Sequence, residues 1–219
     1  GLEALIRWQH PEQGLLPPGS FLPAIEKHPL AVALGEWVID QALAQMEAWA
    51  AAGLEMPVSV NIGALHLQRD DFVARLQGLL AAHPSIRPEL LGMEVLETSA
   101  LEDMDRASAV MGECARLGLT FALDDFGIGY SSLTYLKQLP AGQLKIDRSF
   151  VMDMLDDPED LAILEGVIGL ATAFQRQVVA EGVETEGQGE LLLQLGCSLA
   201  QGYAIARPMP GARVADWVG

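Results

Sequence analysis

Acidic, amide and ammonium side chains recur along this chain at or near the ends of short apolar runs. In chain order they are Glu3, Asn61, Glu94, the pair Asp124-Asp125, Lys145, Glu181 and Gln201. They are spaced by roughly 20 to 60 residues, the length of one or two strand–helix units, and parallel strands carry such groups to one shared end. Most are hard oxygen ligands, which divalent cations prefer. The pattern therefore predicts metal-assisted chemistry at the carboxyl ends of parallel strands.

The most specific local signal is Asp124-Asp125-Phe126-Gly127, which follows the apolar run 119–123. Two carboxylates at a strand end could hold two cations close together, and such a pair can clamp a phosphodiester and activate a water. A DD pair met alone has a simpler interpretation, in which Asp125 caps a turn and Asp124 is a solvated acid.

The other polar groups also have two interpretations each. Glu94 interrupts an apolar strand, where a carboxylate needs a partner or a cation. Asn61 could ligate a metal or be a satisfied core amide. Lys145, placed between two apolar residues, needs counter-charges when buried, and it could either neutralise the acids or hold the attacking water. Glu97 and Glu184 could be acids that are favoured at helix N-termini.

Repulsion among the acids favours the metal interpretation. Six carboxylates would share one cleft: Glu3, Glu94, Asp124, Asp125, Glu181 and Glu184. Two like charges about 4 Å apart repel by about 4 kcal/mol at an effective dielectric constant of about 20. Lys145 and Arg7 offset only part of this charge. Two divalent cations would bring the cleft close to neutrality, so the joint pattern predicts a dinuclear metal site.

Strand-like and helix-like patterns alternate throughout, which predicts one α/β domain with a parallel sheet. Strands are expected at residues 2–8, 57–62, 90–96, 119–124, 143–147, 177–181 and 199–205. A loop is expected at 10–20, and helices at 20–27, 30–52, 67–82, 98–117, 158–175, 186–195 and 211–218, with a short one ending before Pro140. Thr98-Ser99 is the expected cap of the helix at 98–117, and Thr185 caps the helix at 186–195 in the interpretation that makes Glu184 a surface acid. Seven strands are one fewer than a closed barrel needs, so we expect a preceding strand outside this sequence.

The charge and cysteine content of the chain limit the partners and the cell compartment that we expect. Thirteen Lys and Arg against 30 Asp and Glu give a formal charge of −17, which disfavours binding to DNA or RNA polymers. No apolar run is long enough to cross a membrane, so this domain is expected to make no membrane contact. The two cysteines, Cys114 and Cys197, lack metal-ligand spacing and fit a reducing cytosol. We expect a cytoplasmic domain, which segments outside this sequence could anchor to a membrane.

Together the motifs resemble those of the EAL-domain family, the cyclic di-GMP phosphodiesterases. They are EAL (3–5), VNI (60–62), ExxE (94–97), DDFGIGYSSL (124–133), LKIDRSFV (144–151), VVAEGVET (178–185) and QGYAIARPMP (201–210). The resemblance implies a TIM-like (β/α)8 barrel whose first, antiparallel strand is missing here. It also implies Mg²⁺- or Mn²⁺-dependent hydrolysis of cyclic di-GMP to linear pGpG. Because Ca²⁺ prefers longer bonds and more ligands, we expect it to inhibit.

The resemblance implies roles residue by residue. One metal would be held by Glu3, Asn61, Glu94 and Asp124, and the second by Asp124, Asp125 and Glu181. Glu181 and Lys145 would position the water. Arg7 would contact phosphate, Leu5, Glu184 and Gln201 would also line the substrate site, and Glu97 would anchor the loop after Asp125. Three positions depart from the usual residues, with Gly63 for Ser, Ile128 for Thr and Gly142 for Asp.

The resemblance also implies a homodimer through the helices that follow the Asp124-Asp125 and Lys145 strands. The apolar residues expected there are Tyr135, Leu136, Phe150, Val151, Met152 and Leu155, some of which must pack on the barrel. The competing functions are a receptor that binds cyclic di-GMP without hydrolysis, an adaptor that binds no nucleotide, and another barrel aldolase or metal-dependent hydrolase. Loss of metal ligands would mark the receptor, and every matched ligand is present in this sequence.

Overall fold

The protein is described by a computed structural model, which covers residues 1–128 and 133–218, with the side chains of 133–135 outside the description. The chain forms two compact units. The first comprises residues 1–94, 105–120 and the segment from 209 onward, and the second comprises residues 95–104 and 121–208.

The first unit contains parallel strands in the order β1-β4-β5, with helices and a separate hairpin. Its strands are β1 (Leu2–Ala4), β4 (Val58–Asn61), the start of β5 (Leu91–Leu96), and the antiparallel pair β2 (Trp8–His10) and β3 (Gly14–Leu16). Its helices are η1 (Pro18–Ser20), α1 (Leu22–Ile25), α2 (Leu30–Ala51), α3 (Ala64–Leu67), α4 (Phe72–Ala82), η2 (Pro88–Leu90), α6 (Met104–Arg116), η3 (Gly211–Arg213) and α11 (Val214–Val218).

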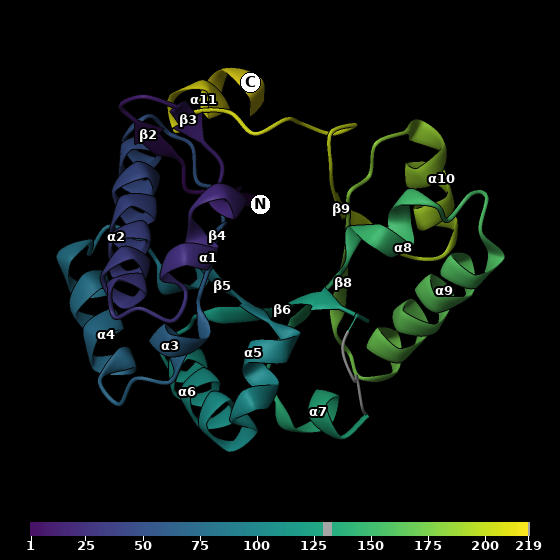
Figure 1. The fold of residues 1–219 in the computed structure, drawn as a ribbon, viewed down its shortest axis with the longest axis horizontal. Coiled ribbons are helices and arrows are strands. Elements are labelled where there is room, and N and C mark those ends of the chain that lie inside the picture. Colours follow the sequence, from purple (N-terminus) through teal and green to yellow (C-terminus); the bar gives the residue numbers. More distant parts are fainter. Residues whose placement is uncertain (129–132, 219) are drawn as a thin grey trace. The chain divides into compact units, whose positions relative to one another are not determined.

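Apolar packing between helix and sheet holds this unit together. Helix α2 lies against β4 and beside α4 (Figure 1). Its residues Ile39 and Leu43 are buried, as are Val58 and Val60 of β4. A fully buried aliphatic side chain contributes about 1.5–3 kcal/mol, so this packing positions the strand that ends at Asn61.

The second unit contains four parallel strands that pair in chain order, β6 (Thr120–Phe126), β7 (Gln143–Ile146), β8 (Gln177–Glu181) and β9 (Leu199–Gln201). Its helices are α5 (Glu97–Glu102), α7 (Leu133–Gln138), α8 (Arg148–Met152), α9 (Pro158–Ala173) and α10 (Glu186–Gln194). Helix α9 packs on β7 and β8, and α8 lies against α9 and β8. Strands and helices alternate here as the sequence predicts.

Several predicted boundaries are wrong, most of them near the N-terminus. The strand expected at 2–8 ends at Ala4, and the expected loop 10–20 contains part of the β2–β3 hairpin. Gly14, at φ +75°, supplies the left-handed residue at this hairpin turn, and the Trp8 ring packs edge-on against Phe21. The helix expected at 20–27 is only the short α1, preceded by a 3₁₀ turn that begins at Pro18.

Two long helices predicted from the sequence differ from the observed ones. The helix expected at 67–82 begins only at Phe72, as α4, and the separate short helix α3 precedes it. The helix expected at 98–117 is divided into α5 and α6. Thr98-Ser99 lies inside α5 rather than capping it. The strand expected at 199–205 ends at Gln201, because the following segment folds back with a hydrogen bond from Ile205 N–H to the Gly202 carbonyl. By contrast, β8 and the Thr185 cap of α10 are as predicted.

Two further expectations concern the thiols and the membrane. Cys114 and Cys197 are free and buried, and burial raises the pKa of the Cys114 thiol to about 12. Among the described residues, no helix combines the length and the apolarity that crossing a bilayer requires.

Candidate active site

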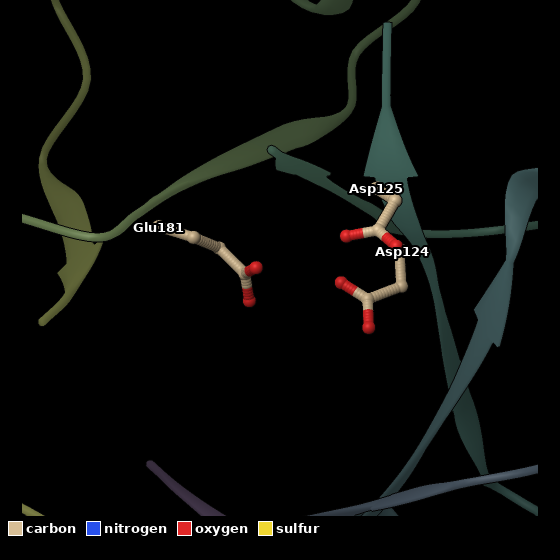
Figure 2. A group of neighbouring side chains, drawn as sticks. All are labelled: Asp124, Asp125 and Glu181. Atoms are coloured by element: carbon tan, nitrogen blue, oxygen red, sulfur yellow. The ribbon is translucent and has the colours of Figure 1, made fainter. Parts of the chain in front are cut away.

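A bulge near the end of β6 sets the directions of Asp124 and Asp125. The pairing of β6 with β7 shifts between Leu123 and Phe126, and Asp125 has a left-handed backbone with φ +52°. Side chains of consecutive residues in a regular strand point to opposite faces, whereas a bulge re-aims one of them. Asp tolerates the left-handed region better than most residues. Both carboxylates therefore project toward Glu181 at the end of β8 (Figure 2).

Three carboxylates and one ammonium form a compact cluster. Asp124, Asp125 and Glu181 each offer an oxygen atom, and these atoms lie within 4.8 Å of one another. Lys145 Nζ lies 2.6 Å from Glu181 Oε1 and 3.2 Å from Asp124 Oδ1. The Lys145 side chain is 3% exposed, so its charge depends on these partners rather than on water. The structure thus brings together four of the residues that the sequence singles out.

The donor set fits a divalent cation. All three acids supply oxygen, the ligand type of Mg²⁺ and Mn²⁺. Among the described residues, Asp124 Oδ1 is buried and forms an ion pair with Lys145 Nζ but no hydrogen bond. Because this single ammonium also pairs with Glu181, a bound cation would offset the desolvation cost that remains for the acids.

Asp147 is a member of this cluster that the sequence analysis missed. Its Oδ1 accepts a hydrogen bond from Ser149 N–H at 2.8 Å and so caps α8, and its side chain shares a second hydrogen bond with Asp125. Burial raises the pKa of Asp125 to about 6, helped by the charges of Asp124 and Asp147. Burial also acts to raise the pKa of Asp147, but its hydrogen bonds outweigh that effect and lower it. The sequence feature that could have identified Asp147 is an acid directly after a buried strand, two positions beyond Lys145.

Glu97 connects the start of a helix to the loop that follows Asp125. It is the first residue of α5, and its Oε2 accepts a hydrogen bond from Gly127 N–H at 3.3 Å. Gly127 has φ +106°, a conformation that L side chains rarely adopt, and a Cβ on it would lie 3.0 Å from the Phe150 ring. Residues 129–132 of the DDFGIGYSSL motif lie outside the described residues.

The first unit groups a second set of predicted ligands. In the strand register Asn61 lies opposite Glu94, and Glu3 lies opposite Ser59. Asn61 Nδ2 donates to Glu3 Oε1 at 2.7 Å, and Ser59 Oγ donates to the buried Glu94. Parallel pairing therefore places these three predicted ligands at the carboxyl ends of adjacent strands.

The predicted substrate residues lie on two segments. In the first unit, Arg7 Nη1 donates to the carbonyls of Ile6 and Leu5, at 2.9 and 3.3 Å, and the Leu5 side chain is exposed. In the second unit, Gln201 ends β9 opposite Glu181, and Glu184 is exposed on the turn after β8. The register of β8 and β9 thus places Gln201 beside the acid cluster.

Comparison with protein families agrees with this arrangement. The model of the EAL domain matches residues 1–208, nearly the whole chain. The chain belongs to the EAL domain family.

Two curated relatives of this EAL domain come from Pseudomonas aeruginosa. The bifunctional diguanylate cyclase/cyclic di-GMP phosphodiesterase MucR is 43% identical over 215 residues, which are 98% of this chain and 31% of MucR. The cyclic di-GMP phosphodiesterase PA2567 is 36% identical over 218 residues, which are 100% of this chain and 37% of PA2567.

A solved structure supports the fold of this EAL domain. The PaMucR phosphodiesterase in its c-di-GMP complex matches with a TM-score of 0.92 and 43% sequence identity, over 97% of this chain and 86% of that one. The predicted TIM-like α/β fold of the EAL type is therefore confirmed. The EAL domain spans about a third of the length of the curated relatives it matches, 31% of one and 37% of the other.

Proposed function

We propose that this EAL domain is a metal-dependent phosphodiesterase that hydrolyses cyclic di-GMP to linear pGpG. The observation that carries the proposal is the cluster of Asp124, Asp125 and Glu181 around Lys145, on a chain that belongs to the EAL family. The relatives MucR and PA2567, both named as cyclic di-GMP phosphodiesterases, support the same substrate.

We assign the metal ligands by motif. The first set is Glu3, Asn61, Glu94 and Asp124, and the second is Asp124, Asp125 and Glu181. Two bound Mg²⁺ or Mn²⁺ ions would polarise the phosphodiester and lower the pKa of water. We assign to Glu181 the role of accepting a hydrogen bond from the attacking water. Lys145 Nζ, 2.6 Å from Glu181 Oε1, would hold that carboxylate in place. The Leu5 and Ile6 carbonyls hold Arg7 Nη1, so the other N–H groups of the guanidinium would be the ones to contact a phosphate.

The test is incubation with cyclic di-GMP and Mg²⁺, followed by chromatography for pGpG. We expect turnover by the wild type, and loss of at least about 100-fold in kcat, about 2.7 kcal/mol of barrier, in Asp124→Asn and Glu181→Ala. Glu165→Ala is the matched control, because it removes an exposed acid from α9 in the same unit. Tight binding of cyclic di-GMP by the wild type without any pGpG would overturn the proposal in favour of a receptor.

We also propose a homodimer and a reducing cytosolic location. The free, buried cysteines support the location. Of the apolar residues expected at the dimer interface, Leu136 and Val151 are buried in their own unit and cannot contribute. Met152 and Leu155 are exposed, as is Ile128, so a second copy could cover them. Tyr135 falls outside the described side chains.

A further inference from the structure

Gln188 is a buried amide whose hydrogen-bonding capacity is fully used. It lies on α10, is 5% exposed, and belongs to none of the predicted ligand or substrate positions. Its Nε2 donates to the carbonyls of Val151 and Met152, at 3.1 and 3.0 Å. Its Oε1 accepts from the N–H groups of Glu184 and Thr185, at 2.8 and 3.0 Å. A side-chain amide has two donor protons and two acceptor lone pairs, so none is left over.

The partners of Gln188 come from two segments that leave the acid cluster. The two carbonyls lie at the end of α8, the helix that begins just after Lys145 and Asp147. The two N–H groups end the turn that follows Glu181. One side chain therefore joins the segment after Lys145 to the segment after Glu181.

The turn after Glu181 is short and closely packed. Gly182 has φ +74°, and a Cβ on it would come within 2.5 Å of Arg148 Cβ at the start of α8. On the other side, Val183 N–H donates to the Gln201 carbonyl, and Ala204 N–H donates to the Val183 carbonyl, both at 3.0 Å. The turn is thus fixed on the β9 side by backbone hydrogen bonds, and on the α8 side by Gly182 packing and Gln188.

We propose that Gln188 is a positioning residue for the acid cluster. By tying the end of α8 to the turn after β8, it maintains the separation of 2.6 Å between Lys145 Nζ and Glu181 Oε1. Gln188 acts through these two residues and touches no reacting group. The catalytic part of this inference rests on the proposed phosphodiesterase function, whereas its effect on metal binding does not.

Gln188 also helps to cap helix α10, and a control variant must separate this structural role from the proposed positioning role. Its N–H donates to Thr185 Oγ1 at 3.3 Å, completing a capping box at the start of α10. Thr185→Ala removes this cap but leaves all four side-chain hydrogen bonds of Gln188. Gln188→Glu keeps the acceptor for the turn but replaces the two donors with an oxygen that faces two carbonyls.

The experiment compares these two variants with the wild type by Mn²⁺ titration calorimetry, thermal unfolding and steady-state kinetics. We expect Gln188→Glu to weaken Mn²⁺ binding and lower kcat by about ten- to a hundredfold, the effect typical of residues that orient metal ligands, with little change in KM. Thr185→Ala should lower the melting temperature but change Mn²⁺ affinity and kcat by less than about twofold. If both variants lose metal affinity and kcat in proportion to their loss of melting temperature, Gln188 is only structural.

A measurement on the wild type covers the case in which Gln188→Glu does not fold. The side-chain NH₂ protons of Gln188 should exchange with solvent far more slowly than those of the exposed Gln13. Equal exchange rates would overturn the proposal. Mn²⁺ binding is measured by calorimetry without substrate. If the wild type forms no pGpG, the proposed function is refuted, but the calorimetric comparison of the variants still decides the role of Gln188.

Discussion

Lys145 Nζ lies 2.6 Å from Glu181 Oε1, and the lysine is almost entirely shielded from water. Strands β7 and β8 pair in parallel with Lys145 opposite Val179, so Glu181 follows two residues later at the strand end. The long lysine side chain spans this offset. An ammonium in this position offsets part of the repulsion among the acids, which would otherwise oppose folding of the metal-free protein.

Replacing Lys145 tests whether it is needed for folding, for catalysis or for both. Lys145→Met should lower kcat by at least about 100-fold, the scale of a lost acid–base group, and should destabilise the metal-free protein by about 3–5 kcal/mol. Added Mg²⁺ should raise the melting temperature of this variant more than that of the wild type, because the cation replaces the missing charge. Lys137→Met on α7 is the exposed control.

Lys145→Arg separates the two roles, because it keeps the charge without the compact ammonium. Recovery of stability without recovery of rate would assign Lys145 to catalysis as well as neutralisation. Unchanged kcat in Lys145→Met would contradict the catalytic role, and unchanged stability of the metal-free variant would contradict the neutralising role.

Metal removal should stop turnover. We expect exhaustive chelation to abolish pGpG formation, Mg²⁺ or Mn²⁺ to restore it, and Ca²⁺ to bind without restoring it. The reason is that Ca²⁺ prefers more ligands at longer distances than the octahedral ions accept. The assay is initial rate against added cation, with Ca²⁺ titrated against Mg²⁺. Full activity after chelation would refute the metal-dependent mechanism.

Glu97→Ala should act through the loop that follows Asp125. Without the acceptor at Glu97 Oε2, the Gly127 N–H loses its hydrogen bond, and kcat should fall by about tenfold, or about 1.4 kcal/mol. Glu97→Gln keeps an acceptor oxygen at the same length and should retain most activity. Glu102→Ala, an exposed acid on α5, controls for charge. Unchanged hydrogen exchange at Gly127 in Glu97→Ala would rule out this anchoring role.

His83 should make the stability of the first unit depend on pH. Its Nδ1 lies 2.9 Å from Glu47 and its Nε2 lies 3.2 Å from Asp40, both on α2. The hydrogen bond to Glu47, with that to Asp40, raises the pKa of His83 in the folded protein despite partial burial. The folded state thus favours protonated His83. The contribution of His83 to the free energy of unfolding is complete below its pKa in the unfolded chain, about 6.5. That contribution disappears as the pH rises through the higher pKa of His83 in the folded protein.

The measurement is the melting temperature of His83→Gln against the wild type at pH 5.5 and pH 9. We expect a deficit of about 2–4 °C at the lower pH, which shrinks at the higher pH. His28→Gln, which replaces an exposed histidine, should show no such trend. A deficit that is equal at both values would show that His83 acts by packing alone.

The dimer is tested by sedimentation across a wide concentration range. We expect a concentration-dependent dimer, with specific activity falling on dilution. Met152→Asp places a charge on the exposed apolar surface and should shift the protein to monomer. Val218→Asp, at an exposed apolar position in the other unit, is the control. A monomer with undiminished activity at every concentration would refute the proposal.

The sequence alone determined the strand–helix alternation, the family and the residue types of the site. Glu94, Lys145 and Glu181 could be found because each interrupts or ends an apolar run, and that pattern depends only on local spacing. The cap at Thr185 was also visible, since a capping box is encoded within four residues.

Tertiary structure decided how these groups meet. The left-handed backbone of Asp125 comes with a bulge against β7, a feature of strand pairing that no pattern within β6 reveals. Asp147 enters the cluster because it both caps α8 and lies beside Asp125. In the sequence, nothing distinguishes Gln188 from other polar residues of a helix. Its role arises from carbonyls 36 and 37 residues away, a distance that only folding can close.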